Sequence, residues 1–297
     1  MELKTLNTFL RAAQIGKFSK TAQELGYSQS AVTMQIQQLE NELGVKLFDR
    51  VGKTVALTPA GMRLEEYART IIQTIEQAEN DVKSEGVRGK LRIGIAASLC
   101  STYLPQILKK YHELYPMVEI ILRSDTQENM FSMLTKNEID MLYTLDEQIF
   151  KNEYTKMMEK AEDVFFVSSA RNKLADQKRL NLKDITGCDF ILTEKGMSYR
   201  DGLDRLLASK NLAVTPFLEV GDTAVICSLV EQNMGISFLP EYTVRDSIKN
   251  GYIKKLDVQQ CTITVYRQLL CRKDKYITPQ MKAMFDILIE NEKKGRH

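Results

Sequence analysis

Four polar side chains and a methionine of the segment 29–43 carry groups suited to recognition through hydrogen bonds and apolar contact. At about 100° per residue they fall opposite an apolar stripe of Val32, Ile36, Leu39 and Leu43. They are Gln29 at the helix entrance, Ser30, Thr33, Met34 and Gln37. Such groups, presented by a helix, suit the base edges in the major groove of DNA. The alternative is a helical hairpin with a solvated polar face.

The residues around this segment predict two short helices and then a β-hairpin. Ser19 can cap a helix that ends at Leu25, Gly26 permits a tight turn, and Ser28 can cap the segment 29–43. Residues 47–50 and 54–57 alternate as two short strands joined by 51–53. Arg50 and Lys53 of this hairpin could contact DNA phosphates, which would add affinity without sequence information.

Hydroxyl side chains recur further along the chain, where predicted strands give way to helices. In open α/β sheets, ligands bind beyond the carboxyl ends of strands, where helix N-termini offer free N–H groups. The hydroxyls in question belong to Ser98, Ser101, Thr126, Ser198 and Thr223. The alternative is that each one only caps its helix.

Histidine chemistry is nearly excluded, because the sequence holds only His112 and His297. Neither a Ser/His/Asp triad nor a histidine metal site can be built from them, and the glycines form no phosphate-binding loop. The five cysteines, with no CxxC pair, favour reduced thiols over a disulfide framework. We therefore expect no catalytic residue, metal or cofactor, although an enzyme acting through carboxylates alone remains an alternative.

The elements that carry these residues predict three regions: 1–57, a helical segment 58–87, and 88–297. In the last region apolar strands alternate with amphipathic helices, which is typical of βαβ units in a mostly parallel sheet. Strands are expected at 91–95, 118–122 and 139–143, and again at 164–167, 190–192 and 236–239. The restart after about residue 162 predicts two α/β lobes.

The segment 58–87 has the pattern of a coiled-coil helix. Thr58 is a plausible N-cap and Pro59 suits the first helical position. Apolar residues then step by 4, 3, 4, 3 and 4, which is typical of a dimerisation seam. The seam would consist of Leu64, Ala68, Ile71, Ile75, Ala78 and Val82. The alternative is a single helix that lies on its own domain.

Composition is compatible with these assignments. The first 64 residues hold eight Lys and Arg against five Asp and Glu, a net charge of +3 that would favour nucleic acid. The N-terminus has no apolar signal-peptide core, and no run of about 18 apolar residues occurs. We expect a cytoplasmic protein that does not associate with membranes.

The run SQSAVTMQIQQLENELGVKLFDRVGKTVALTPAG, which begins at Ser28, resembles the signature of LysR-type transcriptional regulators. The resemblance implies a winged helix-turn-helix, a linker helix for dimers or tetramers, and a two-lobed effector domain of the periplasmic-binding-protein fold (type 2). Lobe one would comprise 88–162 and 268–297, and lobe two 163–267. Met34 stands where the family commonly has arginine, which leaves the base preference there open.

The resemblance also implies a function. The chain would bind a palindromic double-stranded DNA site, and a small polar or anionic effector would sit between the lobes, next to the five hydroxyl residues named above. Ser198 occupies the place of the redox cysteine in the peroxide-sensing branch, which argues against a disulfide switch. The alternatives are a cytoplasmic solute-binding protein or an enzyme on the same fold.

Overall fold

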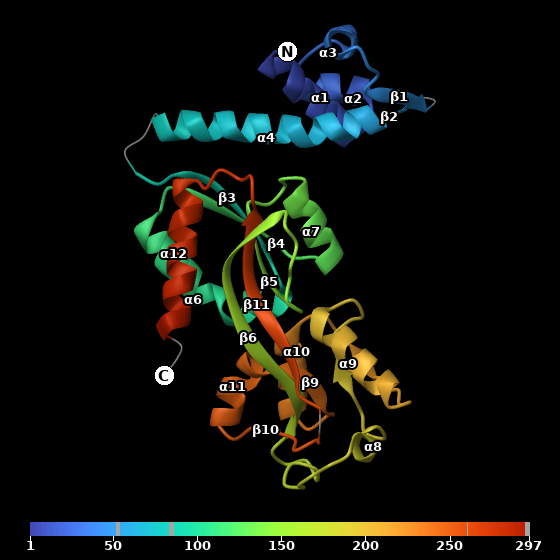
Figure 1. The fold of residues 1–297 in the computed structure, drawn as a ribbon, viewed down its shortest axis with the longest axis vertical. Coiled ribbons are helices and arrows are strands. Elements are labelled where there is room, and N and C mark those ends of the chain that lie inside the picture. Colours follow the sequence, from blue (N-terminus) through green and yellow to red (C-terminus); the bar gives the residue numbers. More distant parts are fainter. Residues whose placement is uncertain (52–53, 83–85, 260, 295–297) are drawn as a thin grey trace. The chain divides into compact units, whose positions relative to one another are not determined.

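The computed structural model describes residues 1–51, 54–82, 86–259 and 261–294. Contacts divide the chain into two compact units, Met1–Gly86 and Val87–His297 (Figure 1). Each unit has its own hydrophobic core. Among the described helices, none is both long and apolar enough to cross a membrane.

The N-terminal unit contains short helices, a hairpin and one long helix. In order, these are α1 (Leu3–Ile15), α2 (Phe18–Leu25), α3 (Gln29–Leu43), β1 (Phe48–Val51), β2 (Thr54–Leu57) and α4 (Pro59–Val82). Gly26 ends α2 at a φ of 68°, which a glycine adopts without strain. The hydroxyl of Ser28 accepts a hydrogen bond from the Ala31 N–H at 3.1 Å, which confirms it as the cap of α3.

Two details of the predicted helix pair are wrong. Ser19 does not cap α2, because the helix begins one residue earlier, at Phe18, with Lys17 at the cap position. Leu43 is not part of the buried stripe of α3, because it lies in the last turn and 40% of it is exposed. Val32, Ile36 and Leu39 are buried as predicted.

The start of α4 packs tightly against the hairpin. Thr58 caps the helix as predicted: its hydroxyl accepts from the Gly61 N–H at 3.0 Å and donates to the Lys46 carbonyl at 2.7 Å. A Cβ on Gly61 would lie 2.2 Å from the Leu47 carbonyl oxygen, so this close approach requires glycine. The α4 helix then runs for 24 residues.

The second unit has two lobes joined by two long strands (Figure 1). The first lobe contains β3 (Gly89–Ile95), α5 (Ala97–Thr102), α6 (Leu104–Leu114), β4 (Val118–Arg123), α7 (Gln127–Thr135), β5 (Met141–Asp146) and α12 (Pro279–Lys294). The second contains α8 (Leu182–Ile185), β7 (Ile191–Leu192), α9 (Ser198–Ser209), β8 (Leu218–Glu219), α10 (Thr223–Glu231), β9 (Ser237–Pro240), α11 (Glu241–Lys249) and β10 (Ile253–Lys255). The joining strands are β6 (Tyr154–Ser169) and β11 (Ile263–Arg272).

The expectation of a mostly parallel sheet is wrong. The main sheet has the order β10-β6-β11-β5-β3-β4, with β9 also paired to β6. Within the described residues of this sheet, the parallel ladders are those of β3 with β4 and β5, whereas the ladders of β6 and β11 are antiparallel. The reason is that β6 continues for 16 residues through both lobes and β11 returns beside it.

Candidate functional site

The face of α3 that the sequence singled out is accessible within its unit. Gln29, Ser30 and Gln37 are exposed, and Met34 is 65% exposed. Thr33 is half-buried, and its hydroxyl donates to the Gln29 carbonyl at 2.9 Å, so its methyl group and not its proton is free for a ligand. The hydroxyls of Ser28 and Ser30 lie 2.9 Å apart.

Glu40 fixes the junction between α3 and the hairpin, a role that sequence reasoning missed. This carboxylate is 7% exposed and accepts from Lys46 at 2.7 Å and from the Leu47 and Phe48 N–H groups at 2.9 and 3.3 Å. Burial by itself would raise the pKa of Glu40, but these donors outweigh it and hold the pKa below its usual value. These hydrogen bonds explain why a glutamate stands at position 40 in the run that begins at Ser28.

The hairpin forms as predicted, with Phe48 opposite Leu57 and Val51 opposite Thr54. The Arg50 side chain and residues 52–53, including Lys53, lie outside the described part. A groove of about 300 Å³ lies between α3 and the hairpin, and Thr33, Gln37 and Asp49 are among its lining residues.

The predicted seam of α4 does not stand free along its whole length. Ala68 is fully buried in the core of the N-terminal unit, where α4 packs on α1, and Leu64 and Ile71 pack against the same core. These three residues therefore face their own unit, which corrects the expectation of an open seam from Leu64 onward. Ile75 is half-buried, Ala78 is exposed, and the Val82 side chain lies outside the described part.

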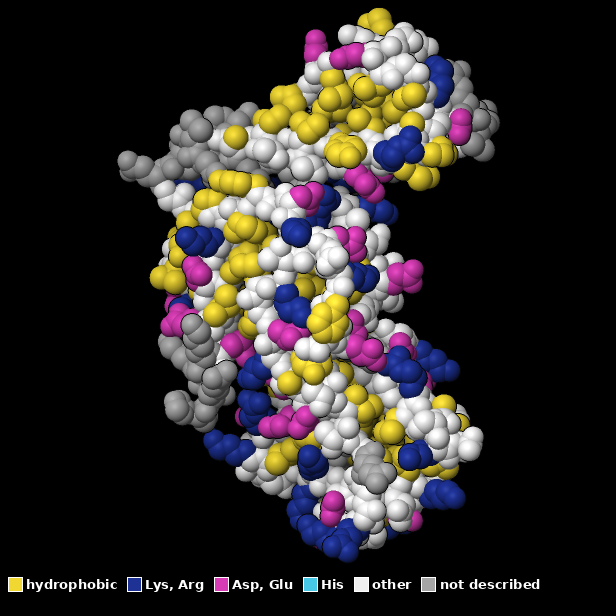
Figure 2. All heavy atoms as spheres, in the orientation of Figure 1, with side chains coloured by type: hydrophobic (Ala, Val, Ile, Leu, Met, Phe, Trp, Pro, Cys, Tyr) yellow, Lys and Arg dark blue, Asp and Glu magenta, His cyan; other side chains and the backbone are white. Residues whose placement is uncertain are grey.

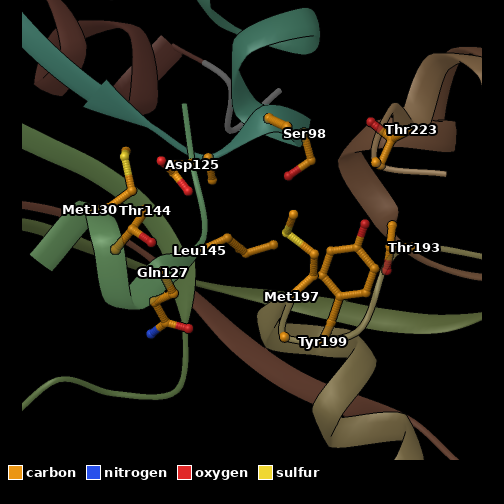
Figure 3. A pocket seen from close by; sticks show the side chains of 14 residues that line it. Ser98, Asp125, Gln127, Met130, Thr144, Leu145, Thr193, Met197, Tyr199 and Thr223 are labelled. Carbon is orange, nitrogen blue, oxygen red and sulfur yellow. The ribbon is translucent and has the colours of Figure 1, made fainter. Parts of the chain in front are cut away.

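A small inner pocket of about 50 Å³ lies in the second unit, where several helices begin (Figure 3). Two of the predicted hydroxyl residues line it: Ser98, whose Oγ accepts from the Tyr242 hydroxyl at 2.7 Å, and Thr223 at the start of α10. Thr144, within β5, and Thr193, directly after β7, also line it. No sequence signal pointed to them, because neither stands at the start of a helix.

The other predicted hydroxyls lie elsewhere or are undescribed. Thr126 caps α7, accepting from the Asn129 N–H at 3.4 Å, and lines an adjoining outer hollow of about 810 Å³. Ser101 is exposed on α5, its hydroxyl donates to the Ser98 carbonyl at 3.4 Å, and it is absent from the described lining of both hollows. The Ser198 side chain is outside the described part.

Arg200 holds the loop that enters the inner pocket. It is 2% exposed, donates to the Thr193 carbonyl at 2.6 Å, and pairs with Asp204 and Glu219 at 3.1 Å. These bonds tie the start of α9 to β7 and β8, so Met197 and Tyr199 are held at the pocket wall.

A buried ionic cluster lies beside the pocket, where β6 and β11 cross between the lobes. Arg267 on β11 has no exposed surface and pairs with Glu162 of β6 at 2.6 Å and with Glu292 of α12. Its guanidinium also lies 4.1 Å from the ring centre of Tyr103 and 5.7 Å from that of Tyr242, the residue that donates to Ser98. The cluster therefore connects the pocket wall to both crossing strands.

The charge states of this cluster follow from its surroundings. Burial raises the pKa of Glu162, although Arg267 opposes the shift. Burial alone would lower the pKa of Arg267. Tyr143 and the two carboxylates outweigh burial and hold this pKa above its usual value, so the guanidinium stays protonated.

Family models match both units of this chain. Residues 3–62 match "Bacterial regulatory helix-turn-helix protein, lysR family", and residues 84–293 match "LysR substrate binding domain". The chain belongs to the LysR family of transcriptional regulators. It is thus a DNA-binding regulator with a small-molecule effector domain, and the resemblance drawn from the signature run is confirmed.

Individual members of the LysR family match over nearly the whole chain. The uncharacterized HTH-type transcriptional regulator YwqM of Bacillus subtilis is 33% identical over 97% of this chain and 98% of its own length. GltR of the same organism is 31% identical, over 95% and 94%. A full-length structure of LysG from Corynebacterium glutamicum, with arginine bound as effector, superposes with a TM-score of 0.70 at 18% identity over 98% and 99%.

Within the described ranges, no three His, Cys, Asp or Glu side chains are grouped so as to hold a metal ion. All five cysteines are free thiols, and Cys100 packs against the core as a small apolar side chain.

Proposed function

We propose that this LysR-family regulator binds a palindromic double-stranded DNA site as a dimer, with α3 in the major groove. The observation that carries the proposal is the accessible row of Gln29, Ser30, Met34 and Gln37 on one face of a capped helix. In a helix-turn-helix dimer the two recognition helices contact successive half-sites on one side of the duplex. Arg50 and Lys53 would contact phosphates and set the salt dependence of binding. We expect the protein to act in the cytoplasm, where it has access to chromosomal DNA.

The last turns of α4 are proposed to carry the dimer contact. Ile75 and Ala78 follow the stretch that packs on the N-terminal core, and a partner helix could cover them. Figure 2 shows hydrophobic side chains gathered over one face of the N-terminal unit, and Met62 and Tyr67 of α4 remain 57% and 69% exposed. Such surface favours self-association. Assembly of two such dimers into a tetramer is an extension of the same proposal.

The effector is proposed to be a small polar molecule that binds between the lobes at Ser98 and Thr223, and next to Thr126. The sequence predicted a polar or an anionic ligand. The inner pocket is bordered by hydroxyl donors and by the first turns of α7, α9 and α10. These groups favour a negative charge, which supports an anionic group on at least one end of the effector. Closure of the lobes on this molecule would change the relative positions of the two DNA-binding units of a dimer.

Replacing Gln29 with alanine is expected to remove sequence preference rather than general affinity. A good base contact contributes about 1–3 kcal/mol, so affinity for the preferred duplex should fall by about 5- to 150-fold. Affinity for a scrambled duplex should change little, because phosphate contacts remain. Fluorescence anisotropy on both duplexes at one salt concentration measures the difference.

Gln38→Ala is the matched control, because Gln38 is also exposed and lies about 180° around α3 from Gln29. It should retain the preference of the unmodified protein. Equal losses on both duplexes for Gln29→Ala would remove this residue from base recognition.

A further inference from the structure

The inner pocket and the outer hollow adjoin one another but have opposite chemistry. Gln127 and Gly196 line both, so a single ligand can extend from one into the other. The inner pocket, at about 50 Å³, has room for a group the size of a carboxylate. The outer hollow, at about 810 Å³, has room for the rest of a metabolite.

The inner pocket offers hydrogen-bond donors without partners. Thr144 and Thr223 are only 6% and 3% exposed, and their hydroxyls have no hydrogen-bond partner among the described residues. Ser98 accepts from Tyr242 and so keeps its own proton to donate. Figure 3 shows these residues around one space. The hydroxyls of Thr144 and Thr223 line the pocket and are not sealed from it, so a ligand that accepts hydrogen bonds can reach them.

Carboxylates predominate among the charged residues that line the outer hollow. Its charged lining residues are Glu128, Asp146, Glu147, Asp201 and Lys151. Two of these carboxylates are already engaged, since Glu147 pairs with Arg205 and Asp201 accepts from the Gly196 N–H at 3.1 Å. Lys151 lies 4.7 Å from the ring centre of Phe131.

Asp146 is a partly buried carboxylate of this wall that forms no ion pair with a described Lys or Arg. It is half-buried, its recorded partner is the Glu147 N–H at 2.7 Å, and among the described residues no Lys or Arg pairs with it. Burial raises the pKa of Asp146 to about 6, and the neighbouring Glu147 adds to the shift. A partly desolvated carboxylate beside an open hollow is stabilised by a cation that enters it.

We propose that the effector is a zwitterion of the amino-acid type, with its carboxylate in the inner pocket and an ammonium or guanidinium group beside Asp146. This proposal rests on the cleft being the effector site. The inner hydroxyls can donate to a ligand carboxylate. Asp125, which also lines the inner pocket, is engaged by the Thr126 N–H and the Asn129 side chain at 2.6 and 2.8 Å. The outer carboxylates disfavour a dianion.

Titration of the full-length protein with charge-matched probes tests the proposal. The zwitterionic probes are L-lysine, L-arginine and 6-aminohexanoate, the dianion is glutarate, and the dication is cadaverine. At least one zwitterion should raise the melting temperature and bind more tightly in calorimetry than either of the others. No response to any zwitterion up to about 10 mM, where even weak ligands bind, overturns the proposal.

Asp146→Asn should weaken binding of the best zwitterion by about 10- to 100-fold, as expected for loss of a charged hydrogen bond. Asp286→Asn, an exposed aspartate of α12 away from both hollows, should leave it unchanged. Thr144→Val should weaken the binding of the zwitterion and of glutarate alike. Glutarate binding that requires Thr144 but ignores Asp146 would overturn the zwitterion and keep the cleft, whereas binding that ignores both would remove the ligand from the cleft.

The pH dependence gives a readout that a purely structural role of Asp146 would not alter. Above its pKa of about 6 the carboxylate is charged, so affinity should rise by about tenfold from pH 5 to pH 7.5. Glu147, Arg205 and Lys151 are the other charged groups acting on Asp146. In Asp146→Asn the rise should disappear.

Discussion

Replacing Arg267 with methionine is expected to lower the free energy of unfolding of the effector domain by about 3–5 kcal/mol, because the buried Glu162 would lose its partner. Glu292 would keep Lys160 and the Tyr143 hydroxyl. Chemical denaturation followed by circular dichroism measures the loss. Arg245→Met is the matched control, since Arg245 is 49% exposed and pairs with Glu241 only at 3.9 Å. It should cost less than about 1 kcal/mol.

The Arg267→Met protein should also depend on pH in a defined direction. The pKa of Glu162 already lies above its usual value, and removal of the guanidinium can only raise it. A carboxyl group whose pKa is higher in the folded than in the unfolded state stabilises the fold when protonated. Stability of the variant should therefore increase as pH falls from 7 toward 5. A loss below about 1 kcal/mol with no such pH dependence would show that the cluster contributes little to the fold.

Replacing Ile75 with aspartate is expected to dissociate the dimer. Two carboxylates would face one another at an apolar contact, which costs several kcal/mol and should raise the dissociation constant by at least about 100-fold. Light scattering across a concentration series measures the change. Thr74→Asp, one position earlier on an exposed part of α4, is the control and should remain dimeric. If Ile75→Asp stays dimeric and still binds a palindromic duplex, the dimer contact lies elsewhere, for example in the effector domain.

Most of the structure of the DNA-binding unit could be predicted from the sequence, because the signals for its caps and turns are local. Ser28, Gly26 and Thr58 act within a few residues of their own positions, at caps and turns. The error over Leu64, Ala68 and Ile71 arose because a heptad pattern specifies an apolar face without specifying what covers it. Here α1 of the same unit covers it.

The residues that line the effector cleft were harder to predict, because they come together from distant parts of the chain. Ser98 and Thr223 could be anticipated, since each begins a helix after a strand. Thr144 and Asp146 lie near the end of β5, where nothing in the local pattern separates them from core residues. The long antiparallel strand β6 could not be predicted over its full length, because its first half is rich in charged residues and does not alternate regularly.

The binding of DNA by the full-length regulator tests the central claim most directly. Repeated selection from a random duplex library at about 0.15 M salt, followed by anisotropy on the enriched and a scrambled duplex, gives the specificity ratio. The account predicts an enriched site with two related half-sites about one helical turn apart, bound at least about 10³-fold more tightly than the scrambled duplex. A folded protein that enriches no sequence and binds both duplexes equally would contradict it.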